Sequence, residues 1–276
     1  MNKEAMRPAQ AVDPKKRFSD RVADYKKHRP EYPVKIIDIL HAEGALRPQT
    51  SVADVGSGTG MLCKLFFPYV EKVYGVEPND AMRRQAELDF ADNPRFKSVN
   101  GSAEETTLPI DSVHLITVGQ AFHWFDRQKT RIEFRRILKP GGFVLLVWNQ
   151  RDLKADELQR QYDDLLRRHI PDYNQIDHKT ITDEILYDFY GTDHLKKFML
   201  PNEQLFDLES LKGRLLSSSY VPKPPHPVLE SLMPELEQLF YNVQQNGLLR
   251  FVYKTQIYIG RLNEKLWYCF LTIYIY

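Results

Sequence analysis

Three glycines at alternate positions, Gly56, Gly58 and Gly60, are the residues of this chain best suited to hold a ligand. They follow a short apolar strand predicted at residues 51–55 and lead into a helix predicted at residues 60–68. Because glycine has no Cβ, the backbone there can turn sharply and approach a bound molecule closely. Open α/β sheets bind ligands at the carboxyl ends of their strands, so we expect a nucleotide-like cofactor near residue 58.

The spacing of these glycines helps to choose the cofactor. A dinucleotide-binding loop would have its third glycine where Met61 stands, and a phosphate-binding loop would need a Gly-Lys-Ser/Thr sequence that the chain lacks. Asp54, just before the loop, is unfavourable for phosphate but suits an ammonium group. A cofactor with an amino-acid end and no phosphates, S-adenosylmethionine (SAM), fits this loop, which also contains Ser57. The alternative is a tight turn that binds nothing.

A second candidate contact stands at the end of the next predicted strand, residues 72–77. Glu77 ends this strand and Pro78 follows it. A carboxylate at this position can accept hydrogen bonds from both hydroxyls of a ribose. Asp80 is expected to cap the helix predicted at residues 80–91. The alternative for Glu77 is a solvated carboxylate in a loop.

Four motifs together resemble a known family. They are Asp54-Val55-Gly56-Ser57-Gly58-Thr59-Gly60, Val76-Glu77-Pro78, Gly101-Ser102-Ala103-Glu104 and Gln120-Ala121-Phe122-His123-Trp124-Phe125. The chain resembles class I SAM-dependent methyltransferases, in the small-molecule branch that includes trans-aconitate methyltransferase. The resemblance implies a doubly wound α/β fold with a mostly parallel seven-stranded sheet of order 3-2-1-4-5-7-6, strand 7 antiparallel, and a helical lid insertion.

The resemblance also implies an adenine site after the third strand, predicted at residues 95–99. Ser102 and the backbone of Ala103 would face the purine edge, with Glu104 nearby. Many relatives carry an aspartate where Ser102 stands, and a neutral hydroxyl should accept a weaker hydrogen bond than a carboxylate. The alternative is a helix cap followed by solvated acids.

The fourth strand, predicted at residues 112–118, brings polar groups toward the methyl donor. Gln120, His123 and Trp124 follow it, and in a helical turn Gln120 and His123 would share one face. His123 could act as a general base, position substrate or cofactor, or line the pocket wall. Trp124 could stabilise the sulfonium through its ring face, although aromatic residues here also suit the core.

In relatives the N-terminal segment closes over the cofactor. Tyr25 and Arg29 match positions expected near its carboxylate, which a guanidinium can bind through both oxygens. The alternative is a solvated basic helix.

Bulk properties favour an enzyme acting on small molecules. The 276 residues carry a formal net charge of +1 with acids and bases interspersed, and the two cysteines, Cys63 and Cys269, suggest no disulfide framework. We expect a cytoplasmic monomer or homodimer with no secretory signal, no nucleic-acid or membrane partner and no metal.

The chain divides into five expected units. These are N-terminal cofactor-covering helices (1–50), the SAM-binding core (51–150), a helical lid insertion (151–200), the final antiparallel strand pair (201–262) and a tail without an assigned role (263–276). Further strands are expected at 142–149, 203–208 and 248–259, and helices at 33–43, 127–138 and within 152–190.

The expected reaction is an in-line displacement that moves the sulfonium methyl to an oxygen (a carboxylate among the options) or a nitrogen of a small molecule, leaving S-adenosylhomocysteine. Two other functions stay open at this point: methylation of RNA or protein, and SAM binding without catalysis.

Overall fold

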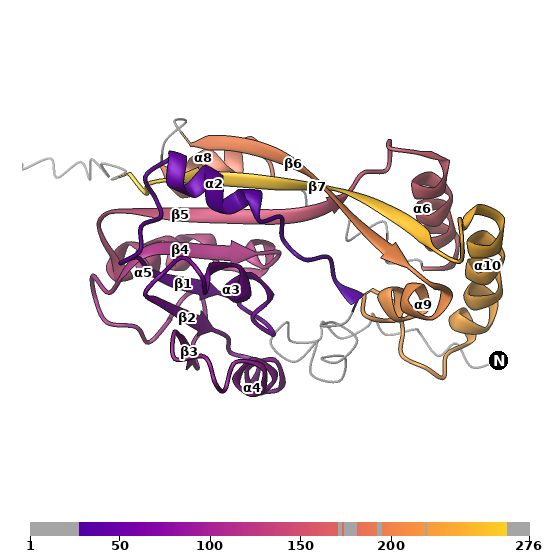
Figure 1. The fold of residues 1–276 in the computed structure, drawn as a ribbon, viewed down its shortest axis with the longest axis horizontal. Helices are drawn as coiled ribbons and strands as arrows, with labels where there is room; N and C mark the ends of the chain where they lie inside the picture. The colour runs from indigo at the N-terminus through magenta and orange to yellow at the C-terminus, as the bar shows by residue number, and fades with distance from the viewer. Residues whose placement is uncertain (1–27, 171–172, 174–180, 192–194, 219, 264–276) are drawn as a thin grey trace, which may run out of the picture.

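The computed structural model describes residues 28–170, 173, 181–191, 195–218 and 220–263 (Figure 1). Seven strands form one sheet in the order β3-β2-β1-β4-β5-β7-β6. β7 pairs antiparallel with both β5 and β6, and the pairs among β1 to β5 are parallel. The predicted order and the antiparallel seventh strand are confirmed. The strands are Ser51–Val55 (β1), Lys72–Val76 (β2), Phe96–Val99 (β3), Val113–Gly119 (β4), Leu138–Arg151 (β5), Lys196–Phe206 (β6) and Leu249–Gly260 (β7).

Helices cover both faces of the parallel half of this sheet. One face packs against α2 (Lys35–Ala42) and α3 (Met61–Phe66), and the other against α5 (Arg127–Ile137) and α8 (Asp183–Tyr190). Successive residues of β1 divide between the two cores, because side chains alternate along a strand: Val52 joins the first and Ala53 the second. The loops that follow β1, β2 and β4 leave from the carboxyl ends of these strands, and the glycine loop after β1 lies at this edge of the sheet.

A third core lies beyond the parallel strands, where β5, β6 and β7 extend to one side (Figure 1). Here α6 (Glu157–His169), α9 (Leu208–Leu216) and α10 (Pro227–Val243) enclose the far ends of β6 and β7. The sequence placed the helical insertion within residues 151–200. The structure draws this group, which we call the helical module, from α6 before β6 and from α9 and α10 after it.

Three local expectations need correction. β6 begins at Lys196 instead of residue 203, and β5 begins at Leu138 instead of residue 142. Asn79, rather than Asp80, caps α4 (Asp80–Asp89), because the Asn79 side chain accepts a hydrogen bond from the Met82 amide. Most of the expected N-terminal unit and nearly all of the tail after residue 263 lie outside the described residues. Within the described part of the chain, no helix has the length and apolar character needed to span a bilayer.

Candidate functional site

The glycine loop turns through three left-handed residues between β1 and α3. Gly56, Gly58 and Gly60 have φ values of +69°, +56° and +80°, which cost little only for glycine. A Cβ on Gly56 would lie 2.8 Å from the Ala121 Cβ, and one on Gly60 would lie 2.4 Å from the Phe90 ring. A Cβ on Gly58 would meet no described atom within 4 Å. The outer glycines are therefore needed for packing, and Gly58 lies on the open side of the loop.

Hydrogen bonds attach this loop to the second strand. The amides of Gly56 and Ser57 both donate to the carbonyl of Val76, at 2.9 and 3.1 Å. Val76 is also the register partner of Val55 in β1 and of Val99 in β3. The carboxyl ends of these three strands are consequently level with one another, and the predicted ribose, methionine and adenine contacts all start from this edge.

Glu77 lies beneath the loop with a largely buried side chain, 8% exposed. Its Oε2 accepts from the Gly58 amide at 2.9 Å, and its Oε1 accepts from the Asn79 amide at 2.8 Å. Burial raises the pKa of Glu77, against the opposing effect of these two amides and of Arg83. Each carboxylate oxygen has a second lone pair, so both remain able to accept from neighbouring hydroxyls.

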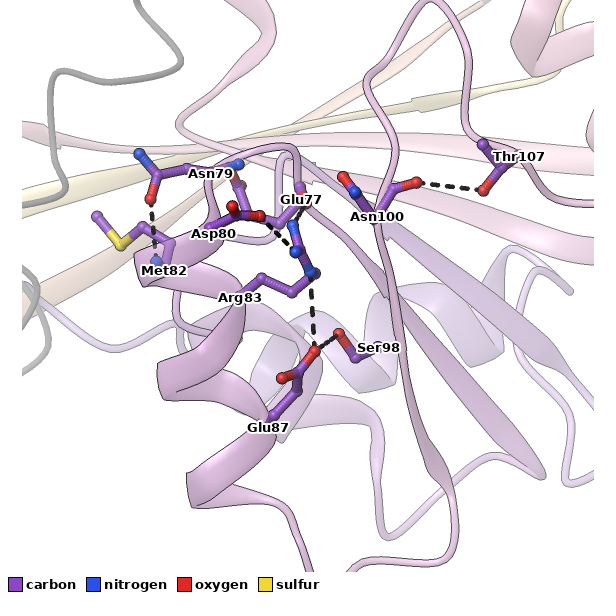
Figure 2. A network of polar contacts seen from close by, with 9 residues as sticks. All are labelled: Glu77, Asn79, Asp80, Met82, Arg83, Glu87, Ser98, Asn100 and Thr107. Atoms are coloured by element: carbon purple, nitrogen blue, oxygen red, sulfur yellow. Dashed lines mark hydrogen bonds and ion pairs between the residues drawn. The ribbon is translucent and has the colours of Figure 1, made fainter.

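The first turn of α4 fixes the position of Glu77 (Figure 2). The Arg83 guanidinium donates to the Glu77 carbonyl at 3.1 Å and also pairs with Asp80 and Glu87. Glu87 in turn accepts from the Ser98 hydroxyl of β3 at 2.6 Å. Pro78, between Glu77 and the cap residue, is half-buried. The carboxylate is thus held by two backbone amides, and the polar network around Arg83 holds the main-chain carbonyl of the same residue.

The buried Asp54 side chain makes its hydrogen bonds with residues inside the fold. Its Oδ1 accepts from the Thr117 hydroxyl at 2.9 Å and its Oδ2 accepts from the Cys63 thiol at 3.2 Å, and the residue is 1% exposed. Burial, partly opposed by these two hydrogen bonds, raises the pKa of Asp54 to about 7. The expected contact between Asp54 and an ammonium group stays a prediction, because both described partners of the carboxyl group come from α3 and β4.

The predicted adenine loop connects β3 to β4 and contacts the start of α5. Ser102 is half-buried and its amide donates to the Glu105 carbonyl at 2.9 Å, whereas the Ala103 side chain is buried in the core. Glu104 Oε1 accepts at 2.9 Å from the amide of Asp126, the residue that caps α5. Glu104 therefore has a structural partner, and the proposed purine contacts of all three residues stay predictions.

The segment after β4 differs from the expected helical turn. Gln120 is a non-glycine residue with φ +60°, and only Phe122–Trp124 form a short 3₁₀ helix. Gln120 thus lies outside the helical turn, and the helical arrangement in which Gln120 and His123 would share one face is not formed. The Gln120 side chain donates to the Asn149 carbonyl at 3.0 Å. His123 and Trp124 are half-buried neighbours with ring centroids 4.7 Å apart.

Residues 28–33, which we call the strap, cross the site on the side of α2. The Asn149 side chain donates to the Pro30 and Glu31 carbonyls, both at 3.2 Å, and Asn202 donates to the Glu31 carbonyl at 2.8 Å. The Tyr32 hydroxyl covers the end of β4, since a Cβ on Gly119 would lie 2.4 Å from it. Figure 1 shows the strap continuing from α2 toward α9.

Arg29, expected at the cofactor carboxylate, donates to the Ser217 carbonyl at 3.2 Å, just after α9. Tyr25 lies outside the described residues. Sequence reasoning missed Tyr32, Asn149 and Asn202. The prolines Pro30 and Pro33 around Tyr32 are a weak signal of extended chain, whereas the two asparagines show no local signal of their strap contacts, which lie more than one hundred residues away along the chain.

These features define a class of protein. A glycine loop after β1, an acidic residue after β2 and the sheet order 3-2-1-4-5-7-6 are those of a class I, Rossmann-like methyltransferase. Residues 53–146 match the family model described as a methyltransferase domain. This domain match and the fold identify the chain as a methyltransferase with the class I architecture.

Relatives and solved structures agree with this assignment. An uncharacterized methyltransferase-like protein of Schizosaccharomyces pombe is 27% identical over 88% of this chain and 94% of its own length. An uncharacterized methyltransferase of Mycobacterium tuberculosis is 38% identical over 49% of this chain and 53% of its own length. A structure described as a type II methyltransferase from Anaeromyxobacter dehalogenans superposes with a TM-score of 0.60 at 24% identity, covering 85% of this chain and 98% of that one.

The family implies SAM as cofactor, and the open side of Gly58 beside the Glu77 carboxylate is compatible with it. The described residues contain no group of three or more histidine, cysteine or acidic side chains that could hold a metal ion. The absence of a metal stays a prediction, as does the particular resemblance to trans-aconitate methyltransferase.

Proposed function

We propose that this protein transfers the methyl group of SAM to an oxygen or nitrogen of a small-molecule acceptor at the carboxyl ends of β1, β2 and β4. The observation that supports this most strongly is the Glu77 carboxylate, held by the amides of Gly58 and Asn79 beside the one loop glycine with open space. Its second lone pairs suit the two vicinal hydroxyls of a ribose.

The other loop residues complete the proposed cofactor site. The loop from Asp54 to Gly60 would take the methionine half, and Ser102, Ala103 and Glu104 would take the adenine. When bound, SAM supplies an already activated methyl group on a sulfonium, so the protein has mainly to align the acceptor atom with it. Alignment of this kind can contribute about 7–11 kcal/mol in favourable cases.

The residues at the end of β4 would provide this alignment. Gln120 is held by the backbone of β5, and the Tyr32 hydroxyl covers Gly119, so the strap limits access of water to this end of the site. His123 would position the acceptor or remove its proton, and Trp124 would line the methyl position. A net charge of +1 supports a small-molecule acceptor over a nucleic acid.

Substitution of Glu77 by alanine tests the proposal. Calorimetry should show SAM binding weakened at least tenfold, because two ribose hydrogen bonds to a charged acceptor are lost. Glu87→Ala, which removes an exposed carboxylate from the same network, should change SAM affinity less than twofold. If Glu77→Ala binds SAM as tightly as the wild type, the assignment of this site is wrong. If SAM binding is weakened as expected, screening metabolite pools for methyl transfer from labelled SAM to the wild-type protein's substrates would identify the acceptor.

A further inference from the structure

Two arginines lie inside the helical module. The Arg151 side chain, at the end of β5, is 12% exposed and donates to Asp163 Oδ1 and to the Tyr173 hydroxyl, both at 2.9 Å. Its guanidinium also lies 4.8 Å from the centre of the Tyr162 ring. Arg214, on α9, donates to the Ser218 hydroxyl at 2.9 Å. Arginine is rarely placed in such surroundings unless it is paired.

Hydrogen-bonding capacity remains unused beside Arg214. Its Nε is buried and has no hydrogen-bond partner among the described residues, and the same holds for the hydroxyl of Tyr253. Tyr253 is 2% exposed. Burial acts to lower the pKa of Arg214, but the electrostatic effects of Tyr253, Tyr220 and Tyr162, together with a contact between the Tyr253 side chain and the guanidinium, outweigh it and raise this pKa.

The charges of this cluster do not balance. Of the carboxylates described around it, Asp163 accepts from Arg151 and also from Arg167, at 2.7 Å. One carboxylate thus serves two guanidinium groups, and Arg214 has no described acid against it. A buried cation without a counter-charge is costly. Arg214 is half-buried and no described carboxylate pairs with it, and its buried Nε and the Tyr253 hydroxyl lack aligned hydrogen-bond partners among the described residues.

The cluster is connected to the proposed methyl-transfer site. Arg151 lies two residues after Asn149 on β5, so both side chains project from the same face. Tyr253, on β7, is the register partner of Arg151 on β5 and of Asn202 on β6. Asn149 and Asn202 both bind the strap, and the Asn149 carbonyl accepts from Gln120.

The length of the strap limits the separation between the arginine cluster of the module and the end of β4. His28 packs on Gly213, next to Arg214, whereas Tyr32 covers Gly119 at the end of β4. Four residue steps of extended chain span at most about 14 Å. A single elongated small molecule could thus reach from the module to the methyl position.

We propose that Arg214 and Tyr253, supported by Arg151, bind an anionic group of the methyl acceptor, a carboxylate or a phosphate that is not itself the atom methylated. This inference rests on the proposed function. A guanidinium fork matches either anion through two hydrogen bonds, and the tyrosine hydroxyl adds a third donor. The anion would supply a counter-charge for Arg214, and a separation of up to about 14 Å from the end of β4 leaves room for an elongated acceptor that reaches both places.

Calorimetry on the full-length protein saturated with S-adenosylhomocysteine tests the inference. The probes are matched pairs: 4-phenylbutyrate with 4-phenylbutyramide, adipate with adipamide, and phenethyl phosphate with phenethyl alcohol. In at least one pair the anion should bind at least tenfold more tightly than its neutral partner, and the carboxylate and phosphate pairs distinguish the two anions. An absence of anion preference in all three pairs would overturn the inference.

Single-residue variants show which side chains cause the preference for the anionic probes. Arg214→Gln should reduce it to twofold or less, Arg214→Lys should keep part of it, and Tyr253→Phe should weaken anion binding three- to tenfold. Arg160→Gln, which alters an exposed arginine of α6, should leave the preference unchanged. A preference that survives in Arg214→Gln contradicts the assignment. If Arg214→Gln fails to fold by near-ultraviolet circular dichroism, Tyr253→Phe decides alone.

The outcome also separates this inference from the proposed function. Failure of the wild type to bind S-adenosylhomocysteine would refute the cofactor site itself. Normal binding of S-adenosylhomocysteine without any anion preference would refute only the anion site.

Discussion

Asp54 carries a titration that the sequence motif does not reveal. In the unfolded chain its carboxyl group has its ordinary pKa of 3.8, whereas burial raises the folded-state pKa to about 7. The folded state therefore holds this proton over a pH range in which the unfolded state has released it. The stabilising contribution is complete below about pH 4 and is lost as the pH rises to about 7, a change of roughly 4 kcal/mol.

Asp54→Asn should remove this part of the pH dependence. Asparagine keeps an acceptor for the Thr117 hydroxyl but does not titrate. Urea unfolding at a series of pH values should show wild-type stability falling more steeply between pH 4 and pH 7 than that of the variant. Parallel curves for the two proteins would mean that Asp54 is ionised throughout this range in the folded state.

The role of His123 is decided by a second experiment on a single residue. His123→Ala should lower kcat at least tenfold, because proton transfer by a positioned side chain typically contributes about 10²–10⁴-fold, and change SAM affinity less than twofold. His226→Ala, which removes only the cap of α10, should leave both quantities unchanged. A loss confined to SAM affinity would instead make His123 part of the cofactor site.

At the scale of elements, Asn149 makes two of the four described hydrogen bonds that side chains of β5 and β6 donate to the strap. Asn149 donates to two strap carbonyls and accepts from Thr255 at 2.6 Å and from Asn202 at 3.1 Å. It is 9% exposed, so removing it leaves buried polar groups without partners. Such groups cost about 1–3 kcal/mol each.

Asn149→Ala should therefore destabilise the protein by about 2 kcal/mol or more in chemical denaturation. Hydrogen exchange in residues 30–34 should rise at the same time. Gln150→Ala is the matched control, because the neighbouring side chain is exposed and contacts Gln256 on β7. Equal effects of the two substitutions would show that the strap does not depend on Asn149.

These elements also show what the sequence could reveal. The glycine loop and Glu77 were predictable because each is a local pattern whose chemistry follows from a strand end. The helix cap at Asn79 was misassigned by one residue, and the left-handed Gln120 has no local marker. The early start of β6 and the sharing of the module between α6, α9 and α10 depend on pairing with β7, which no local pattern describes.

At the scale of the whole molecule, the helical module has a core of its own. Leu232 and Leu236 of α10 are fully buried there together with Leu211 and Leu215 of α9 and Leu166 of α6. The sheet is covered by two other cores. Separate cores permit separate local unfolding, so the module can open while the cofactor side of the sheet stays folded.

Leu236→Ala should expose this division. Loss of a fully buried leucine costs about 2–5 kcal/mol, and we expect α6, α9 and α10 to lose hydrogen-exchange protection together while β1 and β4 keep theirs. Leu88→Ala on α4, where the side chain is 74% exposed, should change little. Uniform loss of protection throughout the chain would show that the molecule unfolds as a single unit.

The strap has one more consequence, for the order of assembly. His28 to Glu31 are synthesised early, yet their partners Asn149, Asn202, Gln204, Gly213 and Ser217 emerge from the ribosome between one hundred and almost two hundred residues later. A growing chain that stops before β6 lacks most of the surface on which this segment rests. The docking of the strap over the end of β4 is therefore among the last steps of folding to be completed during translation.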